Sequence, residues 1–286
     1  MPDLTLVALG EADIPGLTEL TRRAQWRFTE ADVAAMVAGG RFFGHRAADG
    51  DLASSAALFP YGDAMATVGM VIVSPDWQRR GLGRILTEKC LAEWPHDDRP
   101  VALVSTEQGA PLYSTLGFKT VGHVLKMMGK SPLPGAAADA AAAHAVRPME
   151  AADRAAVFAL DRRALGADRH RVLAAKIDQA GEAAVFRGED GTVTGYGLCV
   201  EQPEQRVVGP IIAPDKRTAA ALVGHLCEGY RGPVRIDIPE PQRAFRDVLE
   251  ARGFVLDDRP PLMLRGGDAL PGERGLWFAL AGQALG

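Results

Sequence analysis

The alternation of hydrophobic and polar residues predicts two helices near the start of the chain. Residues 14–24 and 29–39 carry apolar side chains at helical spacing, so each segment is predicted to form an amphipathic helix. Thr29 precedes the second helix and Asp32 follows in its first turn, a pattern typical of a helix N-cap. The chain therefore opens with a pair of helices that each need a surface to pack on.

A predicted β-hairpin and an alternation of strands and helices follow. The hairpin pairs residues 41–47 with residues 52–59 around Asp49-Gly50, a strong turn dipeptide. The later elements of the first half are a strand at 66–73, a helix from about Gly83 to Trp94, a strand at 101–106, a short helix at 110–116 and a strand near 121–128. This order predicts an α/β or α+β fold, in which helices cover the faces of a sheet.

The second half of the chain repeats landmarks of the first half in the same order. The matched segments are ALGEAD and PMEAAD, ending at Asp13 and Asp153, VIVSPD and PIIAPD, containing Pro75 and Pro214, and LYSTLGF and VLEARGF, containing Gly117 and Gly253. Each match is weak alone, but the offset in residue number is nearly constant. A duplicated fold explains this pattern better than two unrelated domains do.

A segment rich in proline and alanine separates the two copies. Residues 130–145 contain two prolines and a glycine, followed by a run that is almost all alanine. Such a segment has little to bury and is typical of a linker, although the alanines could form a short helix. We therefore divide the chain into an N-terminal domain, residues 1–130, a linker, residues 131–144, and a C-terminal domain, residues 145–286.

Composition and charge exclude several classes of protein. The 286 residues are 47% hydrophobic and 24% charged, which excludes collagen-like, disordered and disulfide-scaffold proteins. The formal net charge of -4 offers no basic field to nucleic acid. Three cysteines without a CxxC pair and six scattered histidines predict no metal site. Because the sequence has no signal-like start and no apolar stretch of membrane-spanning length, we expect a cytoplasmic protein that does not contact a membrane.

The clearest chemistry lies in the loop after the strand at 66–73. This loop carries two glycines, which let a ligand approach the backbone, and three arginines, which supply cationic donors: Gly81, Gly83, Arg79, Arg80 and Arg84. Amide N–H groups at a helix start lack acceptors and carry partial positive charge, so the turn can hold a pyrophosphate. The loop is neither a P-loop nor a Rossmann turn, because GxxxxGK[ST] is absent and Leu86 replaces the third glycine.

Two motifs of the first half occur together at the spacing of a known family. The strand runs through Val73-Ser74-Pro75 into the Q-R-R-G-L-G segment at 78–83, and Tyr113 precedes Gly117-Phe118. This combination resembles motif A and the later Tyr-x-x-x-Gly-Phe segment of the GCN5-related N-acetyltransferases, the GNAT superfamily. Residues 4–128 are therefore identified as a member of this superfamily, and the whole chain resembles its bacterial two-domain type.

The resemblance implies tandem GNAT folds, each with a mixed, mostly antiparallel sheet whose strands splay apart to admit the thioester of acetyl-CoA. The residues implied in acetyl-CoA binding are Val71, Ile72 and Val73 for the pantetheine arm, and Arg79, Arg80, Gly81, Leu82, Gly83 and Arg84 for the pyrophosphate. Tyr113 would lie near the sulfur as general acid toward the leaving thiolate; packing of its ring in the core is the alternative. Since an ordinary thiol is a stronger acid than a phenol, a hydrogen bond from Tyr113 could replace full proton transfer.

The sequence marks the remaining site residues less clearly. The strand at 66–73 contains no carboxylate, so Asp63, Glu107 or a chain of water molecules is the candidate general base. Trp26-Arg27-Phe28 lies between the first two predicted helices, where the family usually builds the wall of the acceptor site. A hydrophobic staple leading into the helix after Thr29 is an equally good interpretation of the same residues.

The second copy lacks the residues that carry chemistry in the first. Aligning Pro75 with Pro214 places residues 218–222 on residues 79–83, which replaces both glycines by Ala220 and Leu222 and predicts that this leucine projects where the phosphates should lie. Leu249 falls on Tyr113. We therefore interpret the second half as a degenerate copy, and we expect one acetyl-CoA per chain and a partly hydrophobic interface between the halves.

These observations favour an acetyl-CoA-dependent N-acetyltransferase that acts on a primary amine of a small molecule or an amino-acid-like acceptor. The alternatives are a non-catalytic acetyl-CoA-binding sensor or regulatory protein, and a protein N-terminal or lysine acetyltransferase. A homodimer is compatible with the sequence. No metal is implied by the chemistry.

Overall fold

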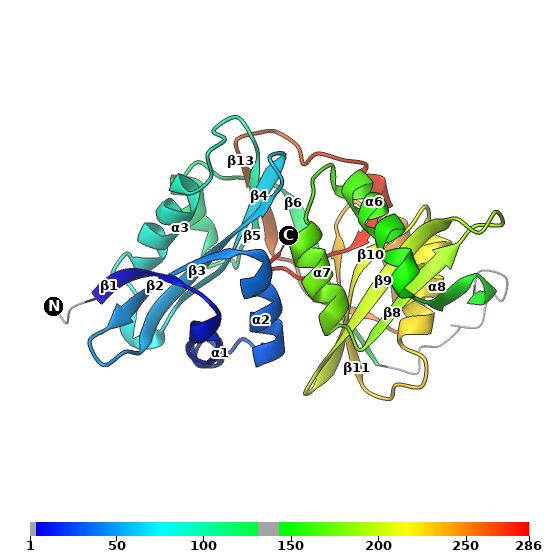
Figure 1. The fold of residues 1–286 in the computed structure, drawn as a ribbon, viewed down its shortest axis with the longest axis horizontal. Coiled ribbons are helices and arrows are strands. Elements are labelled where there is room, and N and C mark those ends of the chain that lie inside the picture. The colour runs from blue at the N-terminus through cyan, green and yellow to red at the C-terminus, as the bar shows by residue number, and fades with distance from the viewer. Residues whose placement is uncertain (1–3, 131–142, 286) are drawn as a thin grey trace.

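The first half of the chain forms an open sheet with helices on both faces (Figure 1). The computed structural model describes residues 4–130 and 143–285, so most of the predicted linker, residues 131–144, lies outside the described residues. The elements are β1 (Leu4–Leu9), α1 (Ile14–Arg23), α2 (Glu30–Gly39), β2 (Arg41–Ala47), β3 (Leu52–Tyr61), β4 (Met65–Val73), α3 (Leu82–Ala92), β5 (Val101–Val104), α4 (Ala110–Thr115) and β6 (Lys119–Lys130). Each predicted element of this half is present, and Thr29 caps α2 in a capping box with Asp32.

The second half repeats this order of elements and then adds two strands. The elements are β7 (Val146–Pro148), α6 (Arg154–Leu165), α7 (His170–Gln179), β8 (Glu182–Arg187), β9 (Val193–Gln202), β10 (Gln205–Ile212), α8 (Lys216–Leu226), β11 (Pro233–Pro239), α9 (Arg243–Ala251), β12 (Val255–Asp258), β13 (Pro261–Arg265) and β14 (Trp277–Ala279). The order from β7 to β12 equals the order from β1 to β6. The structure thus confirms the duplication that the repeated landmarks predicted.

The two copies exchange strands. Residues 119–123 of β6 pair with β13, which inserts antiparallel between β5 and β6 in the sheet of the first half. From Val124 onward, β6 pairs instead with β11 and β12 of the second half. The strands therefore form one continuous sheet in the order β1-β2-β3-β4-β5-β13-β6-β11-β10-β9-β8-β7, and β12 and β14 branch from it by pairing with β6 and β10. Each half completes the sheet of the other.

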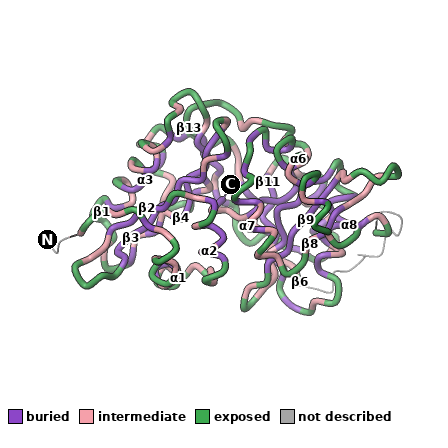
Figure 2. The backbone as a smooth tube through the Cα atoms, in the orientation of Figure 1, coloured by how far each residue is buried: buried purple, intermediate pink, exposed green. Residues whose placement is uncertain are grey.

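Successive side chains of a strand point to opposite faces of the first sheet. On β3, Ala57 and Phe59 pack in the apolar cluster under α1 and α2, whereas Ala56 and Leu58 pack in the cluster under α3 and α4. Because both faces are covered, β3 and β4 are buried along most of their length (Figure 2). A ligand can reach β4 only through a gap between these layers.

Helices α2 and α7 pack against each other where the halves meet (Figure 1). A Cβ on Gly39 would lie 2.5 Å from Cγ2 of Val172, so the glycine permits this close approach. Asp32 accepts hydrogen bonds from Gln179 (2.7 Å) and Gln202 (3.2 Å) of the second half. The interface thus combines apolar packing with a few satisfied polar contacts. In the described part of the chain, no helix has the length and apolar character needed to cross a membrane.

Candidate active site

The loop from β4 to α3 presents a helix start with unsatisfied donors. Gly81 precedes the first residue of α3 with a φ of +80°, and Arg79 has a φ of +61°, both in the left-handed region that favours glycine. The first backbone bond of the helix runs from Ile85 N–H to the Gly81 carbonyl, at 3.1 Å. Among the described residues, no carbonyl accepts from the amides of residues 79–84. Since the space beside Gly81 is open, these amides can face a ligand.

Gly83 leaves a small space, lined by Leu112, Val71 and Val73, which we call the slot. A Cβ built on Gly83 would lie 3.7 Å from the side chains of Leu112 and Val73 and 3.9 Å from that of Val71. The absence of a side chain at Gly83 therefore leaves room for about one carbon atom between α3, α4 and the end of β4.

The sheet itself opens at this point. The parallel strands β4 and β5 pair only at Ala66–Val101 and Thr67–Ala102 and separate beyond these residues. Met70 interrupts β4 with a φ of +52°, and its carbonyl accepts a hydrogen bond from Ser55 Oγ at 2.9 Å. The register between β3 and β4 shifts at the same place, so Met70 marks a β-bulge. The splay that the sequence led us to expect is present between β4 and β5.

Two arginines of the loop lie against neighbouring side chains. The Arg80 guanidinium stacks over Trp77 at 4.7 Å from the ring centroid. Arg84 donates to Thr115 Oγ1 at 2.6 Å and pairs with Glu88 at 3.4 Å. Arg84 therefore ties the start of α3 to α4. Both contacts are exposed, so either guanidinium can exchange its present partner for phosphate at little cost.

Tyr113 lies on α4 with its ring largely buried. The side chain packs on the α3 face of the sheet, and its ring meets Phe118 edge-on with centroids 6.0 Å apart. Burial raises the pKa of Tyr113 to about 12. The phenol is thus a weaker acid here than in water, which favours a hydrogen-bonding role over full proton transfer.

The two carboxylates suggested as general base lie at different ends of the strands. Asp63 occupies the turn before β4, with its side chain 95% exposed and His96 at 3.5 Å. A strand rises about 3.3 Å per residue, so the length of β4 separates this turn from the loop that contains Gly81 by roughly 25 Å. Glu107 is exposed between β5 and α4, at the end where the strands separate. The structure therefore brings only Glu107 to the open end of the splay.

Trp26-Arg27-Phe28 connects α1 to α2 on the face opposite α3. Trp26 and Phe28 pack edge-on at 6.0 Å, against the apolar cluster that includes Met70 of β4. Arg27 forms an ion pair with Glu204 in the turn between β9 and β10 of the second half. The segment thus combines core packing with a contact to the second half.

The corresponding loop of the second half is closed. α8 begins directly after residues 213–215, and the Asp215 side chain accepts from the Thr218 amide at 2.8 Å. Residues 218–222 lie inside α8, so the alignment that placed them on residues 79–83 is wrong. Leu222 is fully buried in the core and does not project into a phosphate site. The connection before α8 is therefore shorter than the loop at residues 74–81, and a carboxylate already caps its helix start.

In the second copy, another strand fills the gap between the corresponding strands, β10 and β11. β10 and β11 pair in parallel at residues 206–208 and 234–236 and then separate, as β4 and β5 do. β14 fills this gap by pairing with Ile211 and Ile212 of β10. The Leu280 amide donates to the Asp237 carbonyl of β11 at 2.9 Å. Sequence periodicity gave no sign of this insertion, because β14 is short and pairs with strands far away in the chain.

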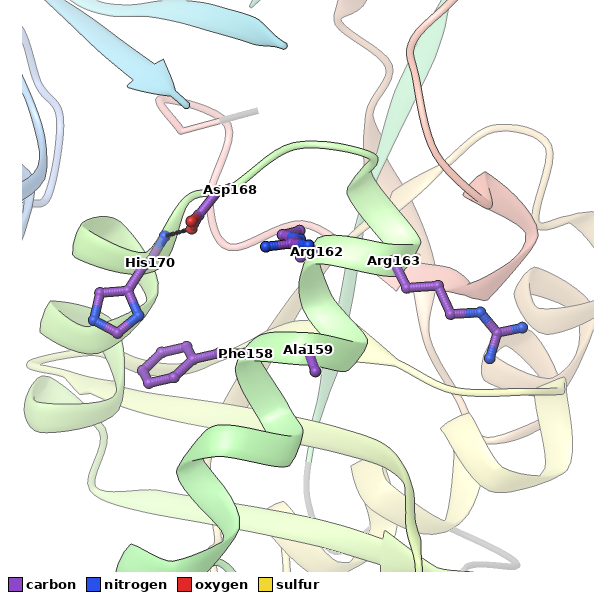
Figure 3. Close-up of a pocket in the computed structure, with 6 residues that line it drawn as sticks. All are labelled: Phe158, Ala159, Arg162, Arg163, Asp168 and His170. Atoms are coloured by element: carbon purple, nitrogen blue, oxygen red, sulfur yellow. Dashed lines mark hydrogen bonds between the residues drawn. The ribbon is translucent and has the colours of Figure 1, made fainter. Parts of the chain in front are cut away.

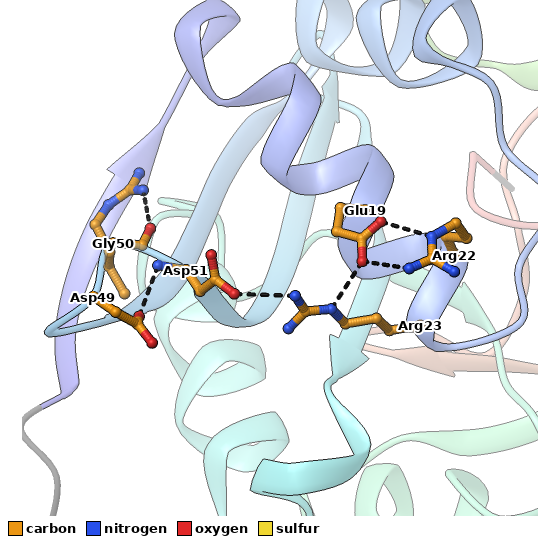
Figure 4. A network of polar contacts seen from close by, with 7 residues as sticks. Glu19, Arg22, Arg23, Asp49, Gly50 and Asp51 are labelled. Carbon is orange, nitrogen blue, oxygen red and sulfur yellow. Dashed lines mark hydrogen bonds and ion pairs between the residues drawn. The ribbon is translucent and has the colours of Figure 1, made fainter.

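Other polar clusters of the molecule lie away from the loop. A cavity of about 480 Å³ is lined by Phe158, Ala159, Arg162, Arg163, Asp168 and His170 (Figure 3). On α1, Glu19 accepts from Arg22 and Arg23, which lowers the pKa of Glu19 to about 2, and Arg23 also pairs with Asp51 (Figure 4). These charges neutralise one another at the surface.

Known proteins resemble this chain in sequence and fold. Two acetyltransferase (GNAT) domain families match it, at residues 24–134 and 157–279. YitH of Bacillus subtilis (strain 168), an uncharacterised N-acetyltransferase, is 36% identical over 282 residues, with 98% of each chain covered. A solved structure from Pyrococcus horikoshii has a TM-score of 0.81 at 17% identity, covering 100% of this chain and 97% of that one. A tandem GNAT protein from the clavulanic acid biosynthesis pathway has a TM-score of 0.66 at 17% identity, covering 93% and 100%. The predicted tandem fold is confirmed.

Proposed function

Because the chain belongs to the GNAT family and is an acyl-CoA-dependent N-acetyltransferase, we propose that its first copy binds acetyl-CoA and acetylates a small-molecule or amino-acid-like amine. The observation that carries this proposal is the helix start at Gly81, whose free amides adjoin the slot beside Val71 and Val73. In the second copy the same position is capped by Asp215. The difference supports one acetyl-CoA per chain, bound in residues 1–130, with residues 145–286 as a degenerate copy.

The amides of residues 79–84, with Arg79, Arg80 and Arg84, would hold the pyrophosphate. Several N–H groups at one helix start can share the charge of the two phosphates, and the left-handed turn aims them outward. The pantetheine arm would then follow β4 along Val71, Ile72 and Val73. This path places the thioester in the splay beside the bulge at Met70.

Transfer forms a bond between the amine nitrogen and the acetyl carbon and breaks the bond between that carbon and sulfur. The nitrogen loses a proton and the sulfur leaves as thiolate. With a pKa of about 12, Tyr113 would have to give its proton to a thiolate whose acid has a pKa near 8.5, which is uphill by about 5 kcal/mol. We therefore assign Tyr113 a hydrogen bond to the developing thiolate, which stabilises the transition state without complete proton transfer.

The amine must also lose a proton before or during attack. A lysine-like amine with a pKa near 10.4 is charged at pH 7, so deprotonation costs about 4.6 kcal/mol. Glu107 stands at the open end of the splay and, with water, is the candidate that the geometry supports better than Asp63. Trp26-Arg27-Phe28 would form the acceptor wall, since it packs beside Met70 on the face that acetyl-CoA does not use.

Titration calorimetry and thiol release together test this function. We expect one CoA bound per chain, and acceptor-dependent release of free thiol from acetyl-CoA with at least one member of a panel of primary amines. Binding without acceptor-dependent thiol across small amines, amino acids and peptides would favour the acetyl-CoA sensor instead. Two CoA bound per chain would contradict the assignment of the site to the first copy alone.

A further inference from the structure

We propose that residues 280–285 form a strap that closes the acceptor face of the splay, and that this strap must move before an amine reaches the thioester. The inference rests on the proposed acetyl-CoA site of the first copy. It also gives the second half a part in the reaction, because the strap runs from β14 of the second half to β4 of the first half.

The strap is seated on β4 just before the bulge. The Leu285 carbonyl accepts hydrogen bonds from the Tyr61 hydroxyl and from Thr67 Oγ1, the latter at 3.3 Å. A Cβ on Gly69 would overlap the carbonyl of Ala284, so the absence of a side chain at Gly69 allows this contact. Leu285 is 3% exposed. These residues are therefore buried against the sheet of the first half.

The strap lies on the face of the sheet that acetyl-CoA would leave free. The phosphate loop, Gly83 and Leu112 belong to the face covered by α3 and α4. Leu285 instead shares its apolar cluster with Met36 of α2 and with Met70 and Ile72 of β4. If acetyl-CoA enters from the α3 face, an amine can meet the thioester without crossing the cofactor only from the α2 face. That approach passes the position of Ala284 and Leu285.

One end of the strap is fixed and the other can swing. Leu280 is held by the Asp237 carbonyl, and Gln283 donates to the Asp237 carboxylate at 3.1 Å. Gly282 lies between these two anchored residues with a φ of +148°, a region that favours glycine, and its carbonyl accepts a hydrogen bond from the Leu285 amide at 2.9 Å. Residues 284–285 follow the last anchored residue, Gln283, so they can lift while Gln283 stays bound. Residues 284–285 contact the first half through two hydroxyl–carbonyl hydrogen bonds, one from Tyr61 of β3 and one from Thr67 of β4, and through the packing of Ala284 and Leu285. Such contacts are weak enough to open and close while β14 stays in its sheet.

A cysteine reporter tests whether the strap is seated and whether it can be lifted. In a Leu285→Cys variant we expect slow alkylation relative to Ala48→Cys, a reporter at an exposed turn. The three native cysteines are buried, and burial raises the pKa of each to about 12, so they give little background. Adding Gly69→Ala to the reporter should speed alkylation about tenfold, because the new Cβ displaces Ala284. Gly122→Ala is the matched control, since a Cβ there meets nothing within 4 Å.

Hydroxylamine, a small nucleophile, tests whether displacing the strap speeds acetyl transfer. Hydroxylamine and acetyl-CoA give acetohydroxamate and CoA: a nitrogen–carbon bond replaces the carbon–sulfur bond, and the proton lost by nitrogen ends on the thiol. With enzyme in excess over acetyl-CoA, Gly69→Ala should raise the rate of this reaction severalfold and Gly122→Ala should leave it unchanged. Tyr61→Phe, which removes one hydrogen bond to the strap and keeps the ring, should raise it less.

The outcomes separate the two proposals. Fast alkylation of Leu285→Cys without Gly69→Ala, or equal alkylation and hydroxylamine rates in all variants that still bind acetyl-CoA, would overturn the strap. Failure of the wild-type protein to bind acetyl-CoA by calorimetry would contradict the proposed function instead. In that case the alkylation rates would still decide whether residues 280–285 are seated on β4.

Discussion

The loop at residues 74–81 and its counterpart at residues 213–215 connect equivalent elements, yet only the first leaves a helix start open. In the first copy, Gly81 has a left-handed conformation, and no described carbonyl accepts from the amides of residues 79–84. In the second copy, Asp215 caps α8 and its carboxylate occupies the place where an anion would bind. The apolar framework survives in both copies, so under the proposed function one shorter connection and one capping residue are enough to remove the ligand site.

The splayed strands of the two copies also differ in what lies between them. Beyond their two paired positions, β4 and β5 separate and no described strand pairs between them, whereas between β10 and β11 the chain inserts its own β14. A splay leaves backbone donors and acceptors unpaired, and these must find partners in a ligand or in the protein. Under the proposed function, the first copy uses a cofactor for this purpose. The second copy uses β14.

Separating the two copies should have the largest effect, because they exchange strands. A fragment of residues 1–130 lacks β13, so β5 and β6 lose their common partner, and the part of β6 after Val124 loses β11 and β12. Exposed strand edges and apolar surface favour aggregation. We expect the fragment to be insoluble or to lack a cooperative unfolding transition, as measured by circular dichroism. A stable monomeric fragment with full activity would show that the halves are independent.

Filling the open loop should abolish cofactor binding. Gly81→Val places a branched side chain at a φ of +80°, and Gly83→Val fills the slot beside Val71 and Val73. Together they should weaken CoA binding at least about 100-fold by calorimetry, since both backbone approach and slot are lost. Gly191→Val is the matched control, because Gly191 has a φ of +79° and open space around it in a turn of the second half. Unchanged affinity in a folded double variant would refute the pyrophosphate assignment.

Removing the hydroxyl of Tyr113 should affect turnover and spare binding. In Tyr113→Phe the ring still packs against Phe118, and kcat should fall by roughly 10- to 1000-fold with little change in KM for acetyl-CoA. Tyr113 should not titrate below pH 11, because burial holds its pKa at about 12. Wild-type turnover, with the chemical step shown to limit the rate, would leave Tyr113 as a core residue only.

Most elements of the first half were predictable because residues close together in the sequence determine them. The features that the sequence analysis missed depend on pairing between distant residues. The cap at Thr29, the turn at Asp49-Gly50 and the glycines of the phosphate loop each act within a few residues, so their patterns are legible in the sequence. The insertion of β13 and the path of the strap depend on partners far away in the chain. The second-copy alignment failed because it assumed equal loop lengths. The offset in residue number between matched landmarks is smaller after Pro214 than before it. This decrease was the sign in the sequence that residues are missing from the second copy.

The smallest effect should come from removing the cap of the second copy. Asp215→Ala deletes the acceptor for the Thr218 amide, which should lower the free energy of unfolding by about 1 kcal/mol in urea titrations. Asp215→Asn, which can still cap the helix, should cost less. Neither variant should gain a second CoA site, because the short connection at residues 213–215 cannot form the outward turn and β14 still fills the splay. If Asp215→Ala bound two CoA per chain, the carboxylate alone would account for the difference between the copies, and the deletion and the inserted strand would be secondary.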